Sequence, residues 1–142
     1  MTYTGRCSCG SVTLAISGEP IGVRQCWCRQ CQQVAGGGAS YNVIFNAEDA
    51  VVSGELAAST WVAQSGNTLT HWRCAACGNP VYGQSSARTH LKVVRLGILD
   101  VGHGLKPQAV IWTDDAPDWA LIDPALESWP QQPPVPPVPN PA

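Results

Sequence analysis

Alternating apolar and polar positions predict short β-strands along most of the chain. Val12, Leu14 and Ile16 alternate with smaller residues, which is the period of a strand that buries one face. Gly18-Glu19-Pro20 ends this stretch. Other stretches are rich in the β-branched and aromatic residues that favour strands: 41–45, 60–63, 69–73, 91–96 and 109–113.

Helical patterns are scarce, and no repeat of fixed period occurs. One short helical turn is expected over 30–35, ended by three consecutive glycines at 36–38. We therefore predict a mainly β domain over residues 1–127. Its core is modest for that length, so a bound metal ion would add to its stability.

The C-terminal residues differ in composition from this domain. Seven of the 12 prolines fall within 130–142. Because proline lacks a backbone donor and fixes φ, we expect 128–142 to form a solvated, polyproline-II-like tail. Composition favours a passive extension over a ligand for a proline-binding groove.

Composition and charge argue against several classes of protein. Of 142 residues, 44% are apolar and 13% are charged, and the net charge is −2. These values argue against a highly charged disordered chain and against a basic nucleic-acid binder. No apolar run approaches the roughly 20 residues of a membrane span, and the polar start of the chain is unlike a signal peptide. We expect a cytoplasmic protein without a membrane or nucleic-acid partner.

Seven cysteines carry most of the chemical information. An odd number cannot all form internal disulfides, and a reducing cytosol opposes disulfides. Tight cysteine clusters in such a chain are typical of metal ligands or catalytic thiols. The clusters have three spacings: C-x-C-G at Cys7–Gly10, C-x-C-x2-C at Cys26–Cys31, and C-x2-C-G at Cys74–Gly78.

The spacings allow one group of four cysteines and one of three. A C-x2-C-G half-site offers two sulfurs to one metal, and a C-x-C-G turn can supply two more. A closed, structural zinc site could then use Cys7, Cys9, Cys74 and Cys77. An open tetrahedral position, typical of catalytic or ligand-binding zinc, would remain at Cys26, Cys28 and Cys31. A site that mixes the central cysteines with Cys74 or Cys77 also fits the spacing, as do reduced thiols without metal.

Together, the three motifs resemble the glutathione-dependent formaldehyde-activating enzyme family, which includes centromere protein V. Further matches are Gly36, Leu96–Asp100, Trp112 and Pro117-Asp118-Trp119, and the resemblance covers about residues 3–125. It implies a zinc-stapled β-tent fold with two zinc ions per chain. The structural zinc is implied at Cys7, Cys9, Cys74 and Cys77, and the active-site zinc at Cys26, Cys28 and Cys31.

One departure from the family pattern concerns the central motif. Family members often have histidine between its first two cysteines, where this chain has Trp27. The substrate can therefore differ from the one that names the family. Trp27 could line a pocket over the metal, or it could point into the core.

A zinc ion with three thiolates would carry a single net negative charge, so it generates hydroxide poorly and is better suited to holding a thiol. A thiol held there could attack an aldehyde to give an S-hydroxyalkyl adduct, and the reverse step is carbon–sulfur cleavage. We therefore expect a carbon–sulfur lyase whose partners are a small, glutathione-like thiol and an aldehyde-like electrophile. The alternative is a non-catalytic, zinc-stabilised interaction module.

Other polar side chains are candidates for supporting roles. His71, His90 and His103 could move a proton at neutral pH, and none has a signal strong enough for a catalytic assignment. Arg24 and Arg29 could bind a substrate carboxylate. Arginines close to the clusters could offset thiolate charge: Arg24, Arg29 and Arg73.

Overall fold

The computed structural model describes residues 2–63 and 65–134. Within these residues there is one α-helix, α1 (Arg29–Val34), and there are three 3-10 turns, η1 (Ala47–Asp49), η2 (Leu96–Ile98) and η3 (Thr113–Asp115). The strands are β1 (Tyr3–Arg6), β2 (Thr13–Ile16), β3 (Gly22–Cys26), β4 (Ser40–Asn46), β5 (Ala50–Ser53), β6 (Leu56–Val62), β7 (Thr68–Cys74), β8 (Pro80–Ser85), β9 (Leu91–Arg95), β10 (Ala109–Ile111) and β11 (Glu127–Ser128). The predicted mainly β fold is confirmed. No helix in the described ranges is long and apolar enough to cross a membrane.

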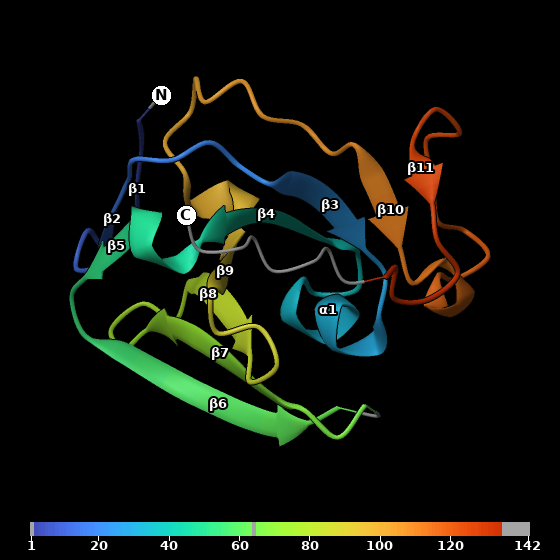
Figure 1. Ribbon diagram of the computed structural model, residues 1–142, viewed down its shortest axis with the longest axis horizontal. Helices are drawn as coiled ribbons and strands as arrows, with labels where there is room; N and C mark the ends of the chain where they lie inside the picture. The colour runs from blue at the N-terminus through green and yellow to red at the C-terminus, as the bar shows by residue number, and fades with distance from the viewer. Residues whose placement is uncertain (1, 64, 135–142) are drawn as a thin grey trace, which may run out of the picture.

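The strands form two sheets (Figure 1). The smaller sheet has the order β1-β2-β5 and is antiparallel. The larger has the order β11-β10-β3-β4-β9-β8-β7-β6 and is antiparallel except at β10, which pairs in parallel with β3 and β11. Figure 1 shows α1 beside β4, between β3 and β7 of the larger sheet.

The main core lies on one face of the larger sheet. Val23, Val43 and Val94 stand directly opposite one another on β3, β4 and β9, and all three are buried. They belong to one apolar cluster with Leu14 and Ile16 of the smaller sheet. Because side chains alternate along a strand, the intervening residues of β3, β4 and β9 must lie on the opposite face.

Several predicted elements appear close to their expected positions. The stretches 41–45, 69–73 and 91–96 correspond to β4, β7 and β9, and the helical turn over 30–35 corresponds to α1. The expected strand over 109–113 ends at Ile111, because Trp112 adopts a left-handed conformation with φ 59° that strand pairing does not tolerate. Strands that were not expected include β3 and β8, whose short sequences contain glycine or proline.

The start of the proline-rich segment packs against the domain, contrary to the expected solvated tail. β11 extends across the predicted boundary between the domain and the tail, at Ser128, and pairs with β10. The backbone N–H of Trp129 donates to the carbonyl oxygen of Val110 at 2.9 Å, and the Trp129 ring packs against Cys26, Cys31 and Ile111. Residues 135–142 of the expected tail lie outside the described residues.

Replacing Phe45 by alanine tests the main core. Phe45 is fully buried, so Phe45→Ala is expected to lower the free energy of unfolding by about 3–5 kcal/mol. Urea denaturation measures this change. Val101→Ala is the control, since Val101 is 99% exposed and its truncation should cost less than about 0.5 kcal/mol. Equal effects of the two substitutions would contradict the assigned core.

Candidate metal centres

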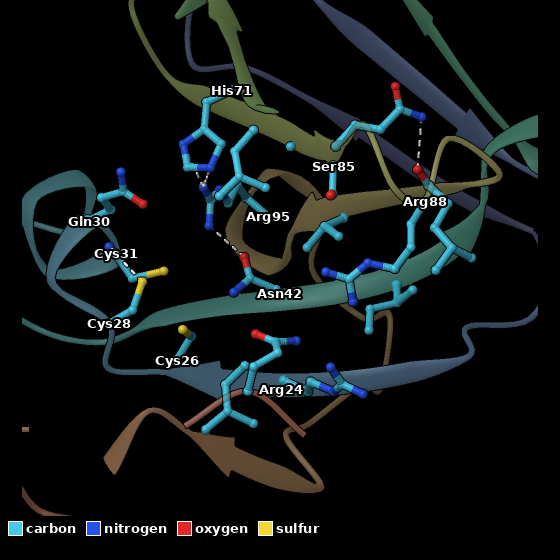
Figure 2. A pocket seen from close by; sticks show the side chains of 18 of the residues that line it. Arg24, Cys26, Cys28, Gln30, Cys31, Asn42, His71, Ser85, Arg88 and Arg95 are labelled. Carbon is cyan, nitrogen blue, oxygen red and sulfur yellow. Dashed lines mark hydrogen bonds between the residues drawn. The ribbon is translucent and has the colours of Figure 1, made fainter. Parts of the chain in front are cut away.

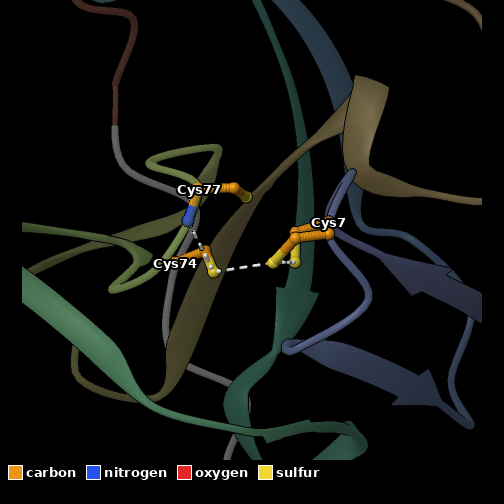
Figure 3. A group of neighbouring side chains, drawn as sticks. Cys7, Cys74 and Cys77 are labelled. Atoms are coloured by element: carbon orange, nitrogen blue, oxygen red, sulfur yellow. Dashed lines mark hydrogen bonds between the residues drawn. The ribbon is translucent and has the colours of Figure 1, made fainter.

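Four cysteines converge from two loops that are far apart in the sequence. Cys7 and Cys9 lie in the turn between β1 and β2, while Cys74 ends β7 and Cys77 lies in the following turn. Glycines with positive φ close both turns, Gly10 at 80° and Gly78 at 78°. Figure 3 shows Cys7, Cys74 and Cys77 directed toward one another.

The spacing of these four sulfurs fits a tetrahedral metal site. The Sγ atoms of Cys7 and Cys9 are 3.5 Å apart, and those of Cys9 and Cys74 are 3.7 Å apart. Zinc–sulfur bonds of about 2.3 Å in a tetrahedron separate the sulfurs by about 3.8 Å. All four ligand atoms lie within 4.8 Å of one another, and all are free thiols.

Backbone N–H groups around this cluster favour the thiolate form that metals bind. Val12 N–H donates to Cys7 Sγ at 3.3 Å, and Cys77 N–H donates to Cys74 Sγ at 3.4 Å. The pKa of Cys77 falls to about 6, chiefly through a hydrogen bond from the Asn79 backbone. The donor set and its hydrogen bonds therefore fit a closed structural ion.

Three further cysteines meet where β3 runs into α1. Cys26 is the last residue of β3, and Cys31 lies in the first turn of α1. Cys28 precedes α1, and its sulfur accepts a hydrogen bond from the Cys31 N–H at 3.3 Å. The three sulfurs lie within 4.8 Å of one another, and no fourth Cys, His, Asp or Glu of the described residues joins them. The sulfurs could thus hold a metal ion while leaving one tetrahedral position open.

The electrostatics of this cluster favour negative charge on one of its three sulfurs, that of Cys31. The pKa of Cys31 is lowered to about 2 because Cys26 and then Cys28 donate hydrogen bonds to its thiolate, with further support from the Ser40 hydroxyl and the charge of Arg95. The pKa of Cys26 is correspondingly raised, because its thiol hydrogen-bonds to Cys28 and Cys31. One sulfur of the cluster is therefore readily ionised even before a metal binds.

Arg95 is held beside this cluster by two side chains. Its Nη1 donates to Asn42 Oδ1 at 2.6 Å, and its Nη2 lies 3.2 Å and 3.3 Å from the two ring nitrogens of His71. Burial, and then the charge of Arg95, lower the pKa of His71 to about 4. At neutral pH the imidazole is uncharged and can accept a hydrogen bond from the guanidinium.

A cavity of about 180 Å³ extends from the three cysteines across the face of the larger sheet opposite the main core. Figure 2 shows Cys26, Cys28 and Cys31 at one end, with Asn42 and Arg95 next to them. Its apolar walls include Ile44, Trp61, Leu69, Leu91 and Val93. Among the residues that the structure describes, the charged ones that line it are Arg24, Arg88 and Arg95, with no Asp or Glu.

A family model for the glutathione-dependent formaldehyde-activating enzyme matches residues 2–115, which include all seven cysteines. The chain belongs to this family. The expected family resemblance is therefore confirmed, while the reaction of this chain is a separate question, because function resides in the site.

A solved structure supports the fold independently. A crystal structure of a Rhodobacter sphaeroides protein, determined as a structural genomics target, matches with a TM-score of 0.57 and 20% sequence identity. The match covers 89% of this chain and 98% of that chain. At this identity the likeness concerns the fold alone. No curated protein matches the chain.

The structure groups the cysteines as four and three, as the family resemblance implies. Cys74 and Cys77 lie with Cys7 and Cys9, so a cluster that mixes them with the central motif is not formed. Trp27 does not line the cavity. It is 4% exposed and meets Trp119 edge to face at 6.2 Å, so the core alternative describes it and the pocket-wall alternative is wrong.

The supporting polar residues are only partly those expected. Arg24 lines the cavity, whereas Arg29 donates to Gln32 and Arg73 donates to Ser59. Of the three histidines, His71 lines the cavity. Many other lining residues were not predicted, because no local motif marks them, and these include Asn42, Trp61, Arg88, Arg95 and Gln132.

Single cysteine substitutions test the two clusters. Cys74→Ser and Cys28→Ser should each remove one of the two ions expected from the two clusters, measured by elemental analysis of purified protein. Cys74→Ser should lower the melting temperature more, because its cluster links the β1–β2 turn to β7. Ala76→Ser, an exposed change in the same turn, is the control and should retain both ions. Unchanged metal content in either cysteine variant would rule out that cluster as a metal site.

A pH titration of His71 by NMR tests the Arg95 contact. In metal-free folded protein we expect the ring to titrate near its lowered pKa of about 4. Arg95→Gln should raise this pKa, because the neighbouring positive charge is lost, but leave it below 6.5, because burial remains. As the pH falls, the unfolded state protonates this histidine near pH 6.5, before the folded state does near pH 4. The contribution of His71 to the free energy of unfolding should therefore fall as the pH drops from 6.5 toward 4. An unchanged pKa in Arg95→Gln would contradict this contact.

Proposed function

We propose that this protein is a zinc-dependent carbon–sulfur lyase or thiol-adduct enzyme. In this proposal it binds a small, glutathione-like thiol at Cys26, Cys28 and Cys31 and forms or cleaves an S-hydroxyalkyl adduct of an aldehyde. The observation that carries the proposal is the difference between the two clusters. Four sulfurs meet in one cluster. Three meet in the other cluster, which lies at the end of a cavity.

The three thiolates suit sulfur chemistry better than water chemistry. When bound there, zinc would hold a fourth, substrate sulfur as an electron-rich thiolate, and the negative charge of the site would disfavour hydroxide formation. Cys26, Cys28 and Cys31 would supply the three protein ligands. The apolar walls of the cavity would limit the access of water to the reacting sulfur.

The reaction needs positive charge where oxygen becomes negative. As the sulfur forms a bond to the aldehyde carbon, the π electrons of the carbonyl move to its oxygen. That oxygen then takes up a proton equivalent to the one the thiol has lost. The guanidinium of Arg95, held by Asn42 and His71, would stabilise this oxygen and the neighbouring thiolate, since its charge already favours the thiolate form of Cys31.

Native mass spectrometry with added glutathione tests the proposal. The wild-type protein, freshly reduced, should carry two zinc ions for its two clusters and bind glutathione non-covalently. Cys28→Ser should lose one zinc and the bound glutathione, because the coordination site is incomplete. Arg29→Ala, an exposed change on α1 outside the cavity, is the control and should retain both. Unchanged zinc content and thiol binding in Cys28→Ser would refute the proposal.

A further inference from the structure

Arg24 and Arg88 lie in the part of the cavity away from the cysteines. Arg24 projects from β3, and Arg88 lies in the turn between β8 and β9. Figure 2 shows both guanidinium groups beyond Asn42 as seen from Cys28 and Cys31. Both arginines line the same cavity, so their two positive charges share one partly enclosed space.

In the part of the chain that the structure describes, no carboxylate lines the cavity beside these charges. The charge of Cys26, at the other end of the cavity, and then that of Glu127, which does not line it, act on Arg24 in the opposite direction to Arg88. One Glu127 oxygen accepts a hydrogen bond from Trp129 Nε1 at 2.9 Å. Arg95 differs from Arg24 and Arg88 because its guanidinium is already bound to Asn42 and His71. Arg24 and Arg88 therefore present two guanidinium groups to the cavity.

The turn that carries Arg88 is held in place by hydrogen bonds. Gln84 Nε2 donates to the carbonyl oxygens of Thr89 and Leu91, at 2.9 Å each, and Arg88 N–H donates to the Ser85 carbonyl oxygen at 3.0 Å. This arrangement keeps two like charges together in a partly buried place. Such an arrangement is unfavourable by itself, and a bound anion would relieve it.

We propose that Arg24 and Arg88 form an anion-binding subsite that selects a thiol carrying a carboxylate. This inference rests on the proposed function, because the sulfur of the same molecule would lie at Cys26, Cys28 and Cys31. Arg24 and Cys26 are two positions apart on one face of β3, so their backbones are about 7 Å apart. Ile44, Leu91 and Val93 supply apolar surface for the methylene groups between sulfur and carboxylate.

Calorimetry with three thiols of similar size tests the subsite in zinc-loaded protein. We expect 3-mercaptopropionate, which is anionic, to bind about tenfold or more tightly than neutral 2-mercaptoethanol, and cationic cysteamine to bind most weakly. The preference should disappear in Arg24→Gln and Arg88→Gln. It should remain in Arg29→Gln, the matched control outside the cavity. Arg24→Lys and Arg88→Lys keep the charge and should retain part of the preference, which separates lost recognition from misfolding.

The outcomes distinguish failure of the subsite from failure of the proposed function. If neutral and anionic thiols bind equally well and Cys28→Ser abolishes both, the subsite is wrong and the thiol function stands. If butanoate, which has no sulfur, binds as tightly as 3-mercaptopropionate and depends on Arg24 and Arg88, the subsite stands and the thiol function fails. Glutathione provides a further comparison. If Arg88→Gln weakens the binding of both glutathione and 3-mercaptopropionate, glutathione uses the subsite. If it weakens the binding of 3-mercaptopropionate alone, the subsite is specific for short thiol acids.

Discussion

The register between β3, β4 and β9 is the constraint on which the rest of the structure depends. Val23, Val43 and Val94 form a buried row across these strands. Since side chains alternate, burying that row places a second row, Arg24, Asn42 and Arg95, on the opposite face. A shift of one residue would exchange the two rows, burying charge in the core and removing it from the cavity. The hydrophobic core thus positions the polar residues of the site.

The two cysteine clusters connect this framework in different ways. The cluster of four joins the β1–β2 turn of the smaller sheet to the end of β7 in the larger sheet, so a bound ion would brace the domain. The cluster of three is local, formed where β3 passes into α1. It faces the cavity, and its charge is balanced by arginine from another strand. The first arrangement is suited to stability and the second to binding.

The segment that follows the family match also contributes to the site. Trp129 packs against Cys26 and Cys31, and Gln132 lines the cavity, although the match ends at residue 115. Trp112 helps to direct the chain toward these positions. Its left-handed backbone turns the chain out of β10, and its Nε1 donates to Gln132 at 3.3 Å. Residues near the start of the proline-rich segment therefore belong to the walls of the site.

The amino-acid sequence by itself determined the features that depend on short range. The ligand motifs at Cys7–Gly10, Cys26–Cys31 and Cys74–Gly78 could be recognised because neighbouring sulfurs and their turns are set by local spacing. Strands such as β4 and β7 could be predicted because apolar alternation is also local. Short strands with glycine or proline, such as β8, could not, since pairing with neighbours rather than propensity stabilises them.

Only the tertiary structure decided which distant side chains meet. It placed Arg95 against His71, although the two are 24 residues apart, and it brought Arg88 to the same cavity as Arg24. It also placed Trp27 in the core and Trp61 in the cavity wall. The physical reason is that these neighbours follow from sheet register and curvature. Both are set by the packing of the whole domain, and neither leaves a pattern in the residues close by in the chain.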